Sequence, residues 1–365
     1  MPNFHNFSEK RNKLPRLQNK RDRYPVIREN IYLRERSRQT LKKKISALAA
    51  FLFLTTLLGA QEQISPFGFL EMPQSSHEAA LGGRNVSVLS GDPSFVYSNP
   101  ATLAGIGRRR LGLNVLTWMS GTTAAGAQFC DTVGRRGAYS VNARYINYGV
   151  SSMTDPTGTE TGTFSSRDIA LAGSYSYRLG ERLIGGVSLR MLYSKYSFYS
   201  SFAMSADLGL LYHSKSGRFN AGVSFTNIGG QLKPFTDIYE YLPFDITAGV
   251  SFRLEHAPLQ LSFTMDRLNK WNSGDFYAPE GSLSDGEMLA RHIMLGVDVL
   301  ITDRIYASLG YNFRHAAELS TAGHKGLTGF TIGAGVDLNR ISFGLSFGKF
   351  QVSSSSLLFN FALDI

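Results

Sequence analysis

At 365 residues, the chain is long enough for one large domain or two ordinary ones. Its formal net charge of +10 comes from residues 1–60, which hold 14 of the 38 basic and 4 of the 28 acidic side chains, so the remainder carries 24 of each. This distribution argues against a nucleic-acid-binding surface on the folded part. The single cysteine, Cys130, excludes an internal disulfide framework and a multi-cysteine metal site.

The amino-terminal segment is basic first and apolar afterwards. Residues 1–40 show no apolar periodicity, three consecutive lysines then precede Ile45–Leu58, and the small residues Gly59 and Ala60 follow. A basic region, an apolar region and a small-residue exit are the parts of a secretory signal peptide. We therefore predict that residues 1–60 are a basic extension plus a signal peptide, removed after Ala60, and that the protein is exported.

Residues 61–110 are rich in proline, glycine and serine, and no strand of membrane-spanning length fits in them. Asp92-Pro93 and Asn99-Pro100-Ala101 are turn sequences, because a residue before proline is disfavoured in the helical region. Since this segment precedes a long series of alternating strands, we predict that it folds inward as a plug. Asn99, Pro100 and Ala101 are the motif of this predicted plug.

From residue 111 onward, apolar and polar residues alternate with a period of two. Phe244–Leu254 shows the pattern best, because its even positions are apolar and its odd positions are polar or small. At about 3.3 Å per residue and a tilt near 45°, this run spans roughly 25 Å, the height of the apolar band of an outer-membrane barrel. We predict strands at residues 111–118, 122–130, 136–147, 167–178, 182–196, 200–212, 217–228, 242–254, 258–269, 290–301, 304–314, 327–338, 340–348 and 356–365. The predicted fold is all-β, an antiparallel transmembrane β-barrel of about 14 strands over residues 111–365.

The two faces of each strand carry different predictions. The even face of Phe244–Leu254 should touch lipid and the odd face the plug, so a charge at Val250 should impair assembly more than one at Thr247. Small inward positions should leave room inside the barrel: Gly185, Gly209, Gly249, Gly296, Gly333 and Gly335. Inward charges are expected to pair and to hold the plug: Arg144, Arg190, Asp207, Asp245, Arg253, Asp298 and Asp337.

The predicted connections sort by parity. Those after even-numbered strands are tight, whereas those after odd-numbered strands include Tyr148–Ser166, Gly229–Tyr241, Lys270–Leu289 and His315–Gly326. Barrels of the bacterial outer membrane have short periplasmic turns and longer outer loops. We therefore predict an outer-membrane location with the long loops outside and both termini periplasmic.

No group of residues predicts catalysis or metal binding. The seven histidines are scattered, and His315 and His324 share one long connection without other ligand types nearby. His213-Ser214 falls in a tight periplasmic turn, away from the outer leaflet where a lipid hydrolase would act. We therefore expect no enzyme activity, no cofactor and no metal site.

Aromatic side chains in the predicted outer loops are candidate partner contacts. Such residues often anchor protein interfaces, but an aromatic girdle at the membrane interface would explain some of them equally well. The candidates are Tyr239, Tyr241, Trp271, Phe276 and Tyr277.

The plug motif followed by about fourteen strands resembles the FadL-like outer-membrane barrels. More specifically, the chain from about residue 64 to its end resembles the PorQ-like barrels, related to PorV, of the type IX secretion system. The matching segments are Ala80–Asn85, Tyr145–Gly149, Gly162–Phe164, Tyr199–Phe202, Asp207–Gly209, Asn227–Leu232 and Leu242–Asp245. The chain departs from this pattern in its long basic leader and in ending on Ile365 rather than on an aromatic residue.

This resemblance implies a non-enzymatic function. PorQ-like barrels hold a PorZ-like protein at the cell surface in an attachment complex that includes the sortase PorU and the barrel PorV. That complex links secreted cargo to lipopolysaccharide. Two alternatives remain open at this point: a FadL-like transporter of hydrophobic solutes and a lipid-modifying outer-membrane enzyme.

Overall fold

The computed structural model describes residues 65–118, 121–277, 282–319, 328–350 and 355–365. They belong to the compact unit Glu62–Ile365. The predicted basic extension and signal peptide, residues 1–60, and His324 lie outside the described residues. None of the helices in the described ranges is long and apolar enough to cross a membrane.

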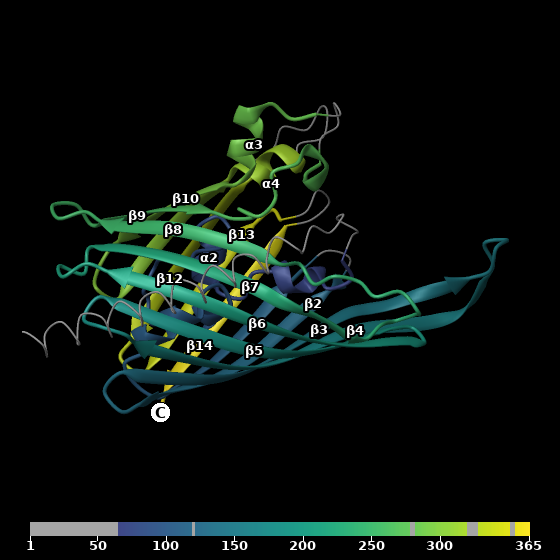
Figure 1. Ribbon diagram of the computed structural model, residues 1–365, viewed down its shortest axis with the longest axis horizontal. Helices are drawn as coiled ribbons and strands as arrows, with labels where there is room; N and C mark the ends of the chain where they lie inside the picture. The colour runs from purple at the N-terminus through teal and green to yellow at the C-terminus, as the bar shows by residue number, and fades with distance from the viewer. Residues whose placement is uncertain (1–64, 119–120, 278–281, 320–327, 351–354) are drawn as a thin grey trace, which may run out of the picture. The chain divides into compact units, whose positions relative to one another are not determined.

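In the described residues, fourteen antiparallel strands form a closed barrel, in which consecutive strands pair and β1 pairs with β14 (Figure 1). The strands are β1 Arg110–Thr117, β2 Thr123–Val133, β3 Gly137–Thr154, β4 Glu160–Arg178, β5 Leu183–Tyr196, β6 Tyr199–His213, β7 Phe219–Lys233, β8 Asp245–Arg253, β9 Leu259–Met265, β10 Ile293–Leu300, β11 Ile305–Asn312, β12 Phe330–Leu338, β13 Ile341–Gly348 and β14 Ser356–Asp364. Pairing the first strand with the last satisfies backbone groups that lipid could not. The predicted all-β barrel of 14 strands is confirmed.

Alternating burial along each strand separates an inner from an outer face. In β8, Asp245, Thr247 and Gly249 are buried, whereas the outward Val250 and Phe252 are 39% and 45% exposed. The polar residues therefore face the interior and the apolar residues face outward, as in a barrel that sits in lipid. The predicted orientation of the two faces of this strand is confirmed.

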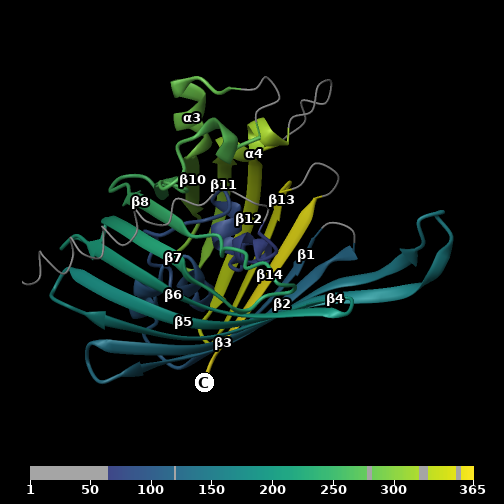
Figure 2. The same ribbon diagram turned by 45° about the vertical axis from the view of Figure 1, so that its right-hand side comes forward.

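The two ends of the barrel differ in their connections. We call the end with the connections after even-numbered strands the short-turn end. The opposite, long-loop end carries residues 234–244, 266–277, 282–292, 313–319 and 328–329. These connections contain short helices: η6 Ser273–Asp275, α3 Asp285–Arg291 and α4 Phe313–Glu318 (Figures 1 and 2). A capping box starts α3, where Ser284 accepts from the backbone of Glu287 and the Glu287 side chain accepts from Ser284.

One predicted long loop is mostly strand. Residues 148–154 extend β3 and residues 160–166 extend β4, so the connection between them is only Asp155–Thr159. We call residues 148–166 the β3–β4 ribbon, which projects beyond the neighbouring strands (Figures 1 and 2). Most of its side chains are exposed on both faces, so the ribbon lacks the apolar alternation that predicted the other strands.

Other boundaries differ near residue 245. β7 continues to Lys233, β8 begins at Asp245 rather than at residue 242, and β9 ends at Met265 rather than at residue 269. In this region side-chain hydrogen bonds and ion pairs replace part of the backbone hydrogen bonding between strands. The period-two pattern of the sequence therefore continues past the ends of β8 and β9 and does not show where these strands end.

Residues 65–109, which we call the N-terminal segment, pass through the barrel interior. Its short helices are η2 Gly68–Glu71, α2 Ser76–Ala80, η3 Pro93–Tyr97 and η4 Pro100–Gly105. Helix α2 packs against β11 to β14, and η4 packs against β3 to β6. Large side chains of this segment are fully buried, including Phe67, Phe69, Leu81, Phe95 and Leu103.

The described chain ends lie at opposite ends of the barrel. At the long-loop end, the Ser65 hydroxyl donates to the carbonyl of Tyr241, and the Tyr196 hydroxyl donates to the carbonyl of Pro66. At the short-turn end, the Ile365 N–H donates to the carbonyl of Arg109. The prediction that both termini share one side stays a prediction, because the residues before Ser65 lie outside the described residues. Strand parity determines where β1 begins and β14 ends, but not the path of the segment before β1.

Candidate functional site

Asn99-Pro100-Ala101 seats the N-terminal segment against the inner wall. The Asn99 side chain accepts a hydrogen bond from the N–H of Ala101 (3.0 Å) and donates to the carbonyls of Val86 (2.8 Å) and Leu210 (3.2 Å). This makes Asn99 the N-cap of η4. Its carboxamide occupies the space beside Gly209, where an added Cβ would lie 2.0 Å from Asn99 Oδ1.

The small inward residues therefore admit the N-terminal segment rather than leaving open space. An added Cβ at Gly186 would lie 2.3 Å from the nitrogen of Ala101, and one at Gly310 would lie 2.2 Å from the nitrogen of Gly82. The prediction for Gly185 is wrong, because in β5 Gly186 is the glycine that faces the interior.

Replacing Gly209 with alanine is expected to displace Asn99 and to lower the free energy of unfolding by about 1–3 kcal/mol, as for other overpacked interiors. The matched control is Gly173→Ala in β4, where an added Cβ has no atom within 4 Å. Denaturant unfolding of the two purified variants is the measurement. Equal unfolding midpoints would show that the fit at Gly209 does not hold the segment.

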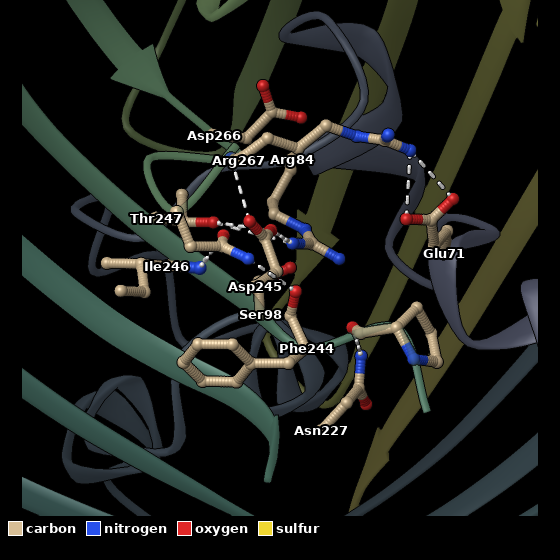
Figure 3. A network of polar contacts seen from close by, with 12 residues as sticks. Glu71, Arg84, Ser98, Asn227, Phe244, Asp245, Ile246, Thr247, Asp266 and Arg267 are labelled. Atoms are coloured by element: carbon tan, nitrogen blue, oxygen red, sulfur yellow. Dashed lines mark hydrogen bonds and ion pairs between the residues drawn. The ribbon is translucent and has the colours of Figure 1, made fainter. Parts of the chain in front are cut away.

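Asp245 lies at the centre of a polar network that joins the N-terminal segment to the base of the long loops (Figure 3). Its carboxylate forms an ion pair with Arg84. It also accepts hydrogen bonds from the backbone N–H of Arg267 (2.7 Å) and from the hydroxyl of Thr247 (3.0 Å). Because Asp245 begins β8 and Arg267 follows β9, one carboxylate connects two strands to the N-terminal segment.

Arg267 makes a second contact with the N-terminal segment. Its Nη2 lies 2.9 Å and 3.0 Å from the two carboxylate oxygens of Glu71. The preceding residue, Asp266, faces α4, where its carboxylate lies 3.7 Å from Arg314. Burial raises the pKa of Asp266, and the Arg314 guanidinium opposes that shift. The contacts thus continue from the N-terminal segment into the long loops.

The charges of this network balance. Arg314 also lies 3.5 Å from Glu318, which is 3.9 Å from Arg291 of α3. The four acidic members are Glu71, Asp245, Asp266 and Glu318, and the four basic members are Arg84, Arg267, Arg291 and Arg314. Glu71 is the most exposed member, whereas the Arg84–Asp245 pair is largely buried, so removing one partner of that pair is costly.

Asn227 connects this network to a second buried ion pair, Arg190–Asp207 (2.5 Å). The Asn227 N–H donates to Asp207 (2.8 Å), its side-chain oxygen accepts from Arg190 (2.9 Å), and its side-chain nitrogen donates to the carbonyl of Pro243 (2.9 Å). Its φ of +61° lies in a β-bulge opposite Asp207. Arg190 in turn donates to the carbonyl of Tyr97 in the N-terminal segment (3.2 Å).

Two other predicted inward charges hold the N-terminal segment directly. Arg144 donates to the carbonyls of Phe69 (3.2 Å) and Met72 (3.3 Å). Asp298 lies 2.9 Å from Nε2 of His77. Arg144, Arg190, Asp245 and Asp298 therefore contact the N-terminal segment directly, and Asp207 forms an ion pair with Arg190. This agrees with the prediction that inward charges hold that segment.

The remaining predicted charges do not contribute in this way. Asp337 is exposed, and the half-exposed Arg253 lies 3.8 Å from Asp303 near the short-turn end. The sequence interpretation missed Asp266, Arg267 and the charged residues of α3 and α4. These lie in connections with no periodicity, so no pattern assigned them to an inner face.

The environment of Thr247 differs from the wet inner face that the sequence predicted. The side chain is fully buried and donates to Asp245. A charge there would enter a packed network rather than a wet interior, so we do not retain the prediction that Thr247 tolerates charge better than Val250.

The predicted aromatic candidates divide into two groups. Tyr239, Tyr241, Trp271 and Tyr277 are 62%, 62%, 51% and 60% exposed. Phe276 is buried, and its ring meets the ring of His292 edge-on at 5.3 Å. Phe276 therefore packs the loop after β9 and does not offer an exposed contact.

Comparison with known proteins supports the barrel assignment. Residues 96–359 match the family model described as type IX secretion system membrane protein PorP/SprF. No curated protein sequence matches the chain. Solved structures with a similar fold include the toluene transporter TodX of Pseudomonas putida, with 15% identity, a TM-score of 0.51, and coverage of 80% of this chain and 97% of that one.

The toluene transporter TbuX of Ralstonia pickettii has 15% identity and a TM-score of 0.52 over 81% of this chain and 100% of that one. A FadL homologue of Pseudomonas aeruginosa has 12% identity and a TM-score of 0.48 over 80% and 98%. At these identities, the likeness to TodX and TbuX shows a common barrel fold and nothing about solutes.

Proposed function

This chain belongs to the family of type IX secretion system membrane proteins PorP/SprF, and from that premise we propose that it holds a partner protein at the bacterial cell surface. In this proposal the long-loop end faces outside and the N-terminal segment is a plug. The resemblance to PorQ-like barrels suggests a PorZ-like partner within an attachment complex that includes PorU and PorV and acts near lipopolysaccharide.

The observation that carries the proposal is an exposed apolar surface at the long-loop end. We call it the rim patch, and its residues are Phe198, Tyr199, Ile238, Tyr239 and Tyr241, which are 82%, 57%, 66%, 62% and 62% exposed. One part of the patch lies at residues 198–199, between β5 and β6, and the other at residues 238–241, after β7. These parts are neighbours, because the rings of Tyr196 and Phe235 lie 5.1 Å apart and Lys233 Nζ donates to the Ser200 hydroxyl. Exposed apolar surface of this kind marks interaction sites.

The height of the rim patch favours a protein partner over a membrane girdle. Tyr212 and Phe219 form an aromatic pair near the short-turn end, with ring centroids 6.5 Å apart. Tyr199 lies thirteen residues along β6 from Tyr212, or about 30 Å at 3.3 Å per residue and a 45° tilt. An apolar band of about 25 Å that starts near Tyr212 ends before Tyr199.

The test is purification of the tagged barrel from outer membranes, followed by mass spectrometry. The patch variant carries Phe198→Ser, Ile238→Ser, Tyr239→Ser and Tyr241→Ser. The control carries Val133→Ser, Leu179→Ser, Ile301→Ser and Leu338→Ser, which remove similarly exposed side chains from the short-turn end. We expect the patch variant to retain its partner at least tenfold less, because central aromatic contacts contribute about 2 kcal/mol or more each.

Retention of the partner by the patch variant, or equal loss from the patch and control variants, would contradict the proposal. Heat-modifiable migration of both variants in gels establishes that each barrel is folded before the comparison is made.

A transporter of hydrophobic solutes is the second candidate, favoured by the barrel fold shared with TodX and TbuX. The apolar part of the interior, however, is occupied by the chain's own Phe67, Phe69 and Leu70, which pack with inward residues such as Ile146 and Leu192. A cavity of about 220 Å³ beside α2 is lined by charged groups that include Asp92, Arg110, Asp298 and Arg304. Saturable binding of toluene by the purified barrel would support transport, and no binding would argue against it.

A further inference from the structure

The β3–β4 ribbon has two sheet edges that the barrel does not cover. β3 pairs with β2 only as far as Asn147, and β4 pairs with β5 only from Ser166, opposite Tyr196. Beyond these residues, the described strands of the ribbon pair only with each other, up to Thr154 and Glu160. Half of the backbone N–H and C=O groups in each ribbon strand therefore point away from the ladder.

The two edges of the ribbon are interrupted at different distances from the barrel. The β3 edge is interrupted between Asn147 and Val150, where the register shifts and Gly149 has a φ of +80°. Bulges of this kind protect an edge from pairing with another strand. The β4 edge has its own register shift farther from the barrel, at Thr161, between the pairs Met153–Gly162 and Thr154–Glu160. Between that shift and the barrel it keeps a regular register from Gly162 to Ser165, opposite Met153 to Val150.

The β4 edge also lacks the charges that usually block strand addition. Residues 161–166 read Thr-Gly-Thr-Phe-Ser-Ser, with no lysine, arginine or proline. Glu160 and Arg167 are the nearest charged residues. Edge strands that must stay single normally carry lysine, proline or a bulge. Residues 162–165, between the bulge at Thr161 and the barrel, have none of these, so this part of the edge is open to pairing.

The turn at the tip keeps the ribbon extended. The Asp155 carboxylate accepts hydrogen bonds from the hydroxyl of Thr157 (2.6 Å) and from the N–H groups of Thr157 and Thr159 (2.9 Å each). These hydrogen bonds lower the pKa of Asp155, that from the Thr157 hydroxyl most. A two-stranded hairpin alone is marginally stable in water, so a third strand would stabilise the ribbon.

We propose that the β4 edge, residues 162–165, binds an extended, uncharged segment of the partner protein, which adds to the ribbon as a strand. The added strand would occupy the position that β5 leaves at Tyr196, so it would continue the barrel sheet away from the rim. Main-chain hydrogen bonds would provide affinity, and the Thr163 and Phe164 side chains on opposite faces would provide selectivity. This inference rests on the proposed function, because it requires a surface partner.

The test uses hydrogen–deuterium exchange on the complex purified from outer membranes and on the free barrel. We expect the amides of residues 162–165 that face the free edge to exchange at least tenfold more slowly in the complex, and those of the β3 edge, residues 150–153, to change less than twofold. Thr163→Lys with Ser165→Lys should reduce partner retention at least tenfold. The matched control on β3 is Ser152→Lys with Val150→Lys, at the positions paired with Thr163 and Ser165, and should reduce retention less than twofold.

Three results would overturn the inference. A wild-type complex that forms without protecting residues 162–165 would refute strand addition and leave the proposed function standing. Equal retention by the β4 and β3 lysine variants would do the same. Protection that accompanies a doubled barrel mass, with no other protein present, would show that a second copy of this chain takes the edge.

Discussion

Replacing Asp245 with alanine is expected to lower the free energy of unfolding by about 3–5 kcal/mol, the usual cost of removing one partner from a buried ion pair. Arg84 would lose its ion pair, and the backbone N–H of Arg267 would lose its acceptor. The N-terminal segment should then detach first, since the Arg267–Glu71 contact depends on the same loop. Urea unfolding and protease cleavage near Arg84 measure both effects.

Two further variants separate the network from a general effect of lost charge. Asp131→Ala removes the partner of the exposed Arg109 at the short-turn end and should leave the unfolding midpoint unchanged. The double variant Arg84→Met and Asp245→Leu should recover much of the loss, because an apolar pair leaves no buried charge unpaired. Unfolding of Asp245→Ala at the wild-type midpoint would show that the network does not hold the segment.

Replacing Leu208 with arginine is expected to destabilise the membrane-inserted barrel by about 2–4 kcal/mol, the cost of a charge on the lipid face near the bilayer midplane. Leu208 faces outward near the middle of β6, opposite Phe225 of β7. The matched control is Tyr212→Arg near the end of the same strand, where the cost should fall to about 0–1 kcal/mol. The measurement is the folded fraction after refolding into lipid vesicles, followed by urea unfolding. Equal effects at the two positions would place the apolar band elsewhere on the barrel.

The sequence predicts the barrel well because each strand separates two environments. Asp245, Thr247 and Gly249 face the packed interior while Val250 and Phe252 face outward, and this difference appears directly as a period of two. The β3–β4 ribbon has no such difference, because most of its side chains are exposed on both faces. Because the period of two is absent from residues 148–166, the sequence predicted a loop there instead of two strands.

The candidate site is only partly visible in the sequence. Asp207 and Asp245 lie at inward positions of alternating strands, so their burial could be predicted. Their partners Arg84 and Arg267 lie in segments without periodicity, and only the path of the N-terminal segment through the barrel brings Arg84 to Asp245. The position of Ser65 at the long-loop end was unpredictable for the same reason.

Besides filling the barrel, the N-terminal segment contacts the base of the long loops through this network. Glu71 and Arg84 contact the residues that begin β8 and follow β9, and Asp266 continues the contacts into α4. Loops of this length usually lose contact with the barrel interior and gain mobility. Here buried ion pairs hold their base, so the long-loop end can present a defined surface to a partner.

The measurement that tests the surface-anchor proposal most directly is the distribution of the partner between cells and culture medium. The strains carry the wild-type chain, the rim-patch variant or the short-turn control as their only copy. The account predicts that the partner stays on cells with the wild type and the control, and is released into the medium with the rim-patch variant, while barrel levels in the outer membrane remain equal. A partner that stays on the cell surface with all three chains would contradict it.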